Sequence, residues 1–167
     1  MENLGIISPK LISNTNESSF YDELILNLSD ADLKTFYFSV AFINYSGLQL
    51  LLDLFKVLEQ RNIKGRVITS TYLNFTDIKS LEKLKTLSNV DVKVYVTDKF
   101  KGFHTKGYIF EYTDYYKVLI GSSNITQSAL KSNIEWNVRL VAKDRHHEPF
   151  LHEILSTFHA LWKETEP

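Results

Sequence analysis

The sequence contains no cysteine, so disulfide bonds, thiolate nucleophiles and cysteine-ligated zinc are excluded. It also lacks an apolar stretch of the roughly 20 residues that span a membrane, and residues 1–16 lack the basic start and long apolar core of a signal peptide. Neither sign of charge is in excess: 20 acidic residues against 19 Lys and Arg give a net charge of -1, which neither indicates nor excludes a nucleic-acid partner. We therefore expect a soluble cytoplasmic protein without a membrane segment.

The length of the chain favours a single domain. Its 167 residues are 44% hydrophobic and 23% charged, which is ordinary for a globular protein. Residues 163–167 have the composition of a linker. We expect residues 1–167 to form one domain, cut from a longer protein.

Hydrophobic periodicity predicts alternating strands and helices in the first part of the chain. The run from Thr35 to Ile43 is almost continuously apolar, which is typical of a central strand covered on both faces. Strand–helix–strand units imply right-handed crossovers and parallel pairing. The predicted strands are 4–7 (ending before Pro9), 35–43, 65–70 and 90–96, and the predicted helices are 19–27, 48–60 and 76–87.

The second part of the chain carries three more closely spaced strands, predicted from residue 103, at 117–120 and at 134–142. The connection between Phe110 and Tyr116 is too short for a crossover helix, so these strands should form an antiparallel hairpin. Helices are predicted at 124–132 and 148–163. The expected fold class is α/β, with a mixed, largely parallel sheet sandwiched by helices.

His104 and Lys106 are the first candidate site residues. They are two apart at the start of a strand, so their side chains should lie side by side on one face. Most histidines are surface or core residues and most lysines face water. However, a lysine in an otherwise apolar strand needs an anionic partner, and a phosphate would serve. A histidine beside it could act as a nucleophile on phosphorus or as an acid and base.

The segment Gly121-Ser122-Ser123-Asn124 follows the next predicted strand. It reads as a strand end and a helix cap. It also reads as an anion site, because backbone N–H groups, the Ser122 and Ser123 hydroxyls and a helix N-terminus would point toward one place. The Asn124 amide could hold a phosphoryl oxygen. The two interpretations are compatible.

Glu135 lies in the third predicted strand, beside Trp136 and two residues before Asn137. A buried carboxylate is costly unless it is paired. We expect its partner to be the imidazole of His104, which it would orient and whose positive form it would stabilise.

Other polar and aromatic residues carry weaker signals. His152 and His159, seven apart, do not match the spacing of a metal site, nor do His146 and His147, so no metal is expected. Two interpretations are open for Tyr72, Phe75 and Tyr108. They could be core residues, or they could line the mouth of the site and stack on a base. Lys99 and Lys101 steer a DNA backbone toward His104 or belong to a solvated loop.

Together, His104-x-Lys106, Gly121-Ser122-Ser123-Asn124 and Glu135-Trp136-Asn137 resemble the phospholipase D superfamily. The likeness covers about residues 20–145. It is closest to the nuclease-like domain at the N-terminus of some bacterial DEAD/DEAH-type helicases and to metal-independent restriction endonucleases. One position departs from the pattern, because Glu111 stands where the family has an aspartate. Glu135 could supply that carboxylate.

The resemblance implies a DNA-cleaving mechanism that needs neither metal nor cofactor. His104 attacks the phosphorus and forms a phosphohistidine, and a second histidine protonates the leaving oxygen and then activates water. Lys106 and Asn124, with Ser122 or Ser123, hold the non-bridging oxygens. Lys101 and Tyr72 would contact the substrate. The chain has one such set, so the mechanism implies a homodimer with a composite site on its two-fold axis.

Two other functions fit the same residues. The anion pocket could belong to a non-catalytic module that binds a DNA phosphate and positions an attached helicase. It could also belong to a phospholipid hydrolase or phosphatidyl transferase, although no Lys- or Arg-rich amphipathic helix is evident in the sequence.

Overall fold

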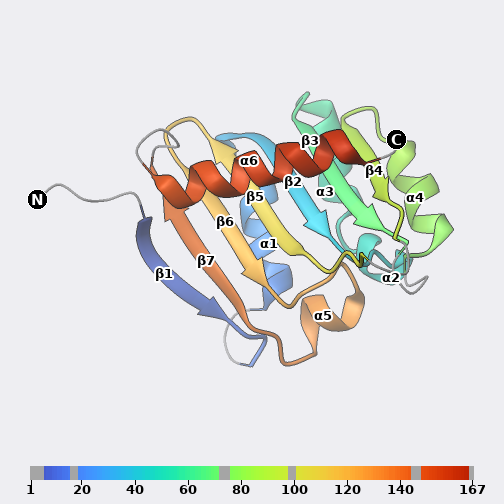
Figure 1. The fold of residues 1–167 in the computed structure, drawn as a ribbon, viewed down its shortest axis with the longest axis horizontal. Helices are drawn as coiled ribbons and strands as arrows, with labels where there is room; N and C mark the ends of the chain where they lie inside the picture. Colours follow the sequence, from blue (N-terminus) through green and yellow to red (C-terminus); the bar gives the residue numbers. More distant parts are fainter. Residues whose placement is uncertain (1–5, 16–18, 72–75, 98–100, 144–147, 166–167) are drawn as a thin grey trace, which may run out of the picture.

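The computed structural model describes residues 6–15, 19–71, 76–97, 101–143 and 148–165. A seven-stranded sheet lies between two layers of helices (Figure 1). The strands are β1 (Ile6–Ile12), β2 (Leu33–Val40), β3 (Lys64–Ser70), β4 (Val90–Tyr95), β5 (Lys106–Tyr112), β6 (Tyr116–Gly121) and β7 (Asn137–Ala142). The helices are α1 (Phe20–Ser29), α2 (Tyr45–Leu48), α3 (Leu52–Gln60), α4 (Ile78–Lys85), α5 (Gln127–Lys131) and α6 (Pro149–Glu164).

The strands follow the order β1-β7-β6-β5-β2-β3-β4. The α/β class and the mixed sheet between helices are confirmed, and so is the antiparallel β5–β6 hairpin. Parallel pairing is less extensive than expected, because only β2, β3 and β4 are parallel to one another. The other pairs are antiparallel, since β5 returns beside β2 and short connections then lead into β6 and β7.

Several boundaries differ from the predictions. β1 does not end before Pro9 but continues to Ile12, with an irregular register between Ile7 and Lys10. Pro9 is tolerated there because β1 is an edge strand and because the irregular register leaves no partner that requires an N–H from this residue. The helix predicted at 48–60 is divided into α2 and α3. Asn44 precedes α2 as its N-cap residue.

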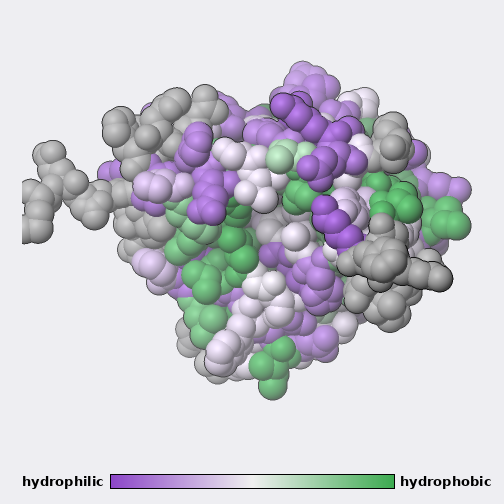
Figure 2. All heavy atoms as spheres, in the orientation of Figure 1, coloured by the Kyte–Doolittle hydropathy of each residue, from purple (hydrophilic) through white to green (hydrophobic). Residues whose placement is uncertain are grey.

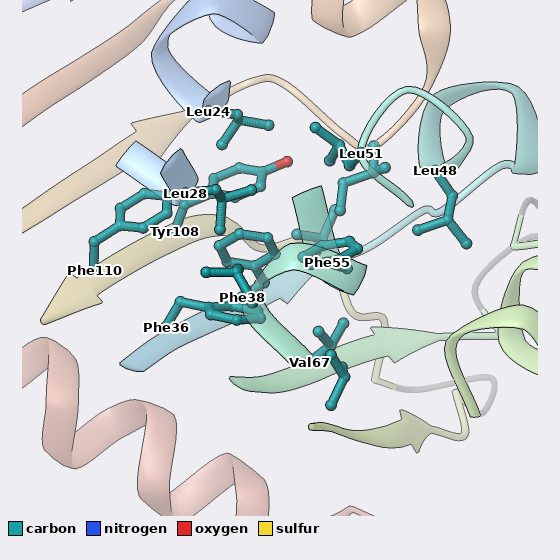
Figure 3. Close-up of a cluster of buried hydrophobic side chains, with 14 of the residues drawn as sticks. Leu24, Leu28, Phe36, Phe38, Leu48, Leu51, Phe55, Val67, Tyr108 and Phe110 are labelled. Carbon is teal, nitrogen blue, oxygen red and sulfur yellow. The ribbon is translucent and has the colours of Figure 1, made fainter. Parts of the chain in front are cut away.

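Each face of the sheet has its own core. On one face, side chains of β2 and β5 pack against α1 and α3 (Figure 3). Phe38 is central in this core, because its ring lies 4.9 Å from that of Tyr108 and 5.0 Å from that of Phe36. On the other face α6 crosses the sheet diagonally and buries Leu151, Leu155 and Phe158 (Figure 1). Side chains alternate between the two cores along each strand.

Candidate active site

His104 lies beside the carboxyl end of β2, just before the chain enters β5. The Val40–Lys106 pair is the last of the β2–β5 register. Beyond it, Ala41 N–H donates to the carbonyl oxygen of Thr105 at 2.9 Å, and the hydroxyls of Thr105 and Ser39 share a 2.7 Å hydrogen bond. These contacts hold His104 at the end of a strand of the parallel part of the sheet, where α/β proteins commonly bind ligands.

The side chains of His104 and Lys106 are in contact, as the two-residue spacing predicts. The Lys106 Nζ lies 2.9 Å from Nδ1 and 3.0 Å from Nε2 of the imidazole. It also donates to the His104 carbonyl oxygen at 3.0 Å. Lys106 is only 8% exposed, whereas His104 is open to solvent. The accessible imidazole therefore lies in contact with the side chain of a mostly buried lysine.

Burial shifts both groups toward their neutral forms. Loss of water around the ring lowers the pKa of His104, and the nearby charge of Lys106 lowers it further. Burial lowers the pKa of Lys106, and the negative charge of Glu135 opposes that shift. A lowered His104 pKa keeps the imidazole neutral, and therefore nucleophilic, at neutral pH.

Asn124 reaches this region through the segment that follows β2. Its Oδ1 accepts from Phe42 N–H at 3.1 Å, while Ile125 forms a parallel bridge with Ile43. Because Oδ1 is occupied, Nδ2 is the amide group that can donate to a ligand, and it has no partner among the residues that the structure describes.

Phe42 was not predicted as a site residue, yet it connects the others. Its ring lies 5.8 Å from that of His104 and 5.8 Å from the Lys106 Nζ, and its backbone holds Asn124. The available sequence signal was its place just after the apolar run of β2, at the carboxyl end of a parallel strand.

Glu135 differs from the expectation that it orients His104. Its carboxylate accepts a hydrogen bond from the Ser122 hydroxyl. The backbone N–H of Ser122 donates to the Trp136 carbonyl oxygen at 3.0 Å. Trp136 N–H also donates to Ser122 Oγ at 3.0 Å. Glu135 makes no hydrogen bond to His104 among the described residues, but its charge acts on Lys106. It precedes β7, so strand alternation does not govern its direction.

Ser123 is not accessible to a ligand beside His104. It is fully buried, and its hydroxyl accepts from Asn137 Nδ2 at 2.8 Å, while its N–H donates to Asn137 Oδ1 at 3.2 Å. The predicted helix cap is also wrong, because α5 begins at Gln127 and Thr126 caps it. Residues 122–124 therefore form a connection between β6 and α5 that is held in place by hydrogen bonds to the segment preceding and starting β7.

The remaining candidates lie around or outside this group. Lys101 is exposed, with its Nζ 5.6 Å from the centre of the Tyr95 ring. Tyr72, Phe75 and Lys99 lie outside the described residues. Tyr108 is a core residue, fully buried, and its hydroxyl donates to the Ser123 carbonyl at 2.8 Å.

Glu111 lies on the α6 side of β5, the face opposite Lys106. Tyr37 OH donates to its carboxylate at 3.4 Å, and the two line a pocket with His152 and His159. Within the described ranges, no three His, Asp or Glu side chains form a group that could hold a metal ion. His146 and His147 lie outside those ranges. No described helix has the length and apolar character needed to cross a membrane.

Comparison with known proteins identifies the family. A protein-family model described as "Cardiolipin synthase, PLD-like domain" matches residues 24–162. A sequence search of curated proteins finds no match. NucT from Helicobacter pylori has a similar structure, with a TM-score of 0.69 and 16% identity over 95% of this chain and 97% of that chain.

Two further solved structures share the fold. The phospholipase D family member Nuc from Salmonella typhimurium matches with a TM-score of 0.61 and 15% identity, over 95% of this chain and 96% of that chain. A mutant of yeast tyrosyl-DNA phosphodiesterase matches with a TM-score of 0.51 and 18% identity, over 80% of this chain and 32% of that chain. At these identities the structures establish the fold alone. The family model covers most of the sequence, and the chain therefore belongs to the phospholipase D superfamily, in the family of PLD-like domains that the model describes.

Proposed function

We propose that this protein is a metal-independent DNA phosphodiesterase that acts through a phosphohistidine on His104. The observation that carries the proposal is the buried Lys106 ammonium, 2.9 Å from the exposed imidazole. A buried cation next to a neutral imidazole attracts a phosphate and places it against the nucleophile. Tyrosyl-DNA phosphodiesterase, a structural neighbour, is by its name an enzyme that acts on DNA.

The proposed steps use groups that surround one point. The lone-pair nitrogen of His104 attacks phosphorus, and the P–O bond to the leaving oxygen breaks as a proton reaches that oxygen. Lys106 and Asn124 Nδ2 donate to the non-bridging oxygens, on which charge develops. Water then attacks the phosphohistidine as the group that protonated the leaving oxygen takes a proton from that water, and the P–N bond to His104 breaks. Glu135, with Ser122, maintains the charge of Lys106 rather than orienting the histidine.

Proton transfer to the leaving oxygen requires a second acid. The sequence holds one H-x-K set, and His104 is its histidine. We therefore propose a homodimer in which two copies of His104 face each other across a two-fold axis. One copy is neutral and attacks, while the other, whose protonated form the negative charge of the bound phosphate would favour, acts as the acid.

We also propose that residues 1–167 act in the cytoplasm as the nuclease domain of a longer helicase or restriction-type protein. The support is the resemblance of residues 20–145 to such domains. The mass of the native protein in cell extract, compared with 19.4 kDa for this chain, tests the attachment.

The direct test is DNA cleavage in excess EDTA. The wild type should cut plasmid and single-stranded DNA, and His104→Ala should cut at less than about one-thousandth of that rate. DNA binding without cleavage by the wild type would favour the non-catalytic module. Hydrolysis of phosphatidylglycerol vesicles without DNA cleavage would favour the phospholipid enzyme, which the family description also suits. Cleavage that requires added metal would contradict the mechanism.

The proposed role of Asn124 as a donor to the phosphate can be tested separately from its structural contact with Phe42. Asn124→Asp keeps the oxygen that accepts from Phe42 N–H but replaces the donating Nδ2 with a negative oxygen. We expect an unchanged melting temperature and a cleavage rate about 10²–10³-fold lower. Asn124→Ala, which loses both groups, should be less stable as well. A wild-type rate for Asn124→Asp would limit this residue to a structural role.

The lowered His104 pKa is also measurable. Lys106→Met retains the buried volume but removes the positive charge that helps to lower this pKa. The His104 pKa should lie below its usual value of about 6.5 in the wild type and rise in Lys106→Met, while staying below 6.5 because burial remains. NMR titration of the His104 Cε1–H signal measures both values. No rise in the variant would show that Lys106 does not tune the nucleophile.

A further inference from the structure

A pocket of about 330 Å³ adjoins the candidate active site on the α6 side of the sheet. His104 and Lys106 form part of its lining. Its sheet wall includes Gly107, Ile109 and Ile120, and its helix wall includes Ile154, Phe158 and Leu161. Figure 2 shows this face of the molecule, with an apolar area over β6 and β7 beside the helix, where Ile120 and Val138 are 37% and 42% exposed.

Gly107 leaves the floor of this pocket open. It lies between Ser39 of β2 and Ile120 of β6 in the strand register. A Cβ built on Gly107 meets no atom within 4 Å. The backbone does not call for glycine, because no glycine in the described residues has a positive φ. The missing side chain therefore creates space next to the histidine.

The lining fits a compact group that has apolar surface and a few polar atoms. The sheet and helix walls are formed mainly by aliphatic and aromatic side chains. Polar groups are also present, because the Ser39 and Thr105 hydroxyls share a hydrogen bond of 2.7 Å and Thr157 lies in the helix wall. A volume of about 330 Å³ is at the small end of ligand pockets, which suits one compact ring system better than long acyl chains.

The position of the pocket restricts what can occupy it. Because His104 lines the pocket and its ring also contacts the Lys106 Nζ, a group in the pocket lies within a short linkage of a phosphate held at that imidazole. In a DNA strand, the group connected to the phosphate by such a short linkage is the base of an adjacent nucleotide. A base in this pocket cannot remain stacked and paired in a duplex.

We propose that this pocket binds a nucleobase next to the scissile phosphate, so that the substrate is single-stranded or locally unpaired DNA. This inference rests on the proposed function and narrows its substrate. The base packs between the sheet and α6 and brings the phosphate into register with His104.

The test measures DNA binding by His104→Ala protein, which does not cut its ligand. Fluorescence anisotropy compares a single-stranded oligonucleotide with the same strand carrying abasic tetrahydrofuran residues. With Gly107 present, the strand with bases should bind at least about tenfold more tightly. Gly107→Val fills the pocket with a residue suited to a strand, and we expect the preference to fall below about twofold.

Two variants make the result specific. Thr157→Phe fills the same pocket from α6 and should reduce the preference in the same way, even if Gly107→Val folds poorly. Leu11→Ala is the matched control, because Leu11 is 53% exposed and pairs with Val138 on the same sheet but does not line the pocket. It should leave the preference unchanged.

The outcomes separate the two claims. DNA cleavage by the wild type with an unchanged base preference in both filled variants would overturn the base pocket and leave the nuclease proposal standing. No binding of either strand, together with no cleavage by the wild type, would contradict the proposed function itself. Loss of phosphatidylglycerol vesicle binding in the filled variants, without an effect on DNA, would assign the pocket to a lipid and overturn the inference.

Discussion

The buried ammonium of Lys106 is the constraint on which the site depends. A lysine that is only 8% exposed requires compensating groups for its charge, and this chain supplies the His104 carbonyl, the imidazole and the charge of Glu135. The first two contacts hold the histidine at the strand end, and the third opposes the lowering of the Lys106 pKa by burial. In the proposed function, a phosphate bound here would place a full negative charge close to the Lys106 ammonium. In the proposed mechanism, binding of the phosphate and activation of the nucleophile therefore have the same physical origin.

The sequence was informative where the geometry is local. The His104–Lys106 contact follows from strand alternation, and the β5–β6 hairpin follows from a short connection. Contacts between distant segments could not be predicted. Phe42 meets Asn124 through a parallel bridge, and Glu135 meets Ser122 because the backbones of Ser122 and Trp136 pair beyond the end of β6. The burial of Ser123 depends on the same pairing, which brings Asn137 against it.

The two faces of the sheet have different tasks near the site. One face carries the dense aromatic core around Phe38, which fixes β5 and hence Lys106 (Figure 3). The other face, crossed by a single helix, leaves open space above Gly107. In the proposed mechanism the first face holds the chemical groups and the second receives the substrate. The missing component is a second acid, which a second copy of the chain would provide.

The most direct test of this account is the activity of mixed dimers. Wild-type and His104→Ala chains are combined in known ratios, exchanged by unfolding and refolding, and assayed for DNA cleavage in EDTA. If each composite site uses both histidines, activity follows the square of the wild-type fraction, so an equal mixture retains about one quarter of the wild-type activity. Activity that follows the wild-type fraction linearly, with about one half retained in an equal mixture, would contradict the composite site.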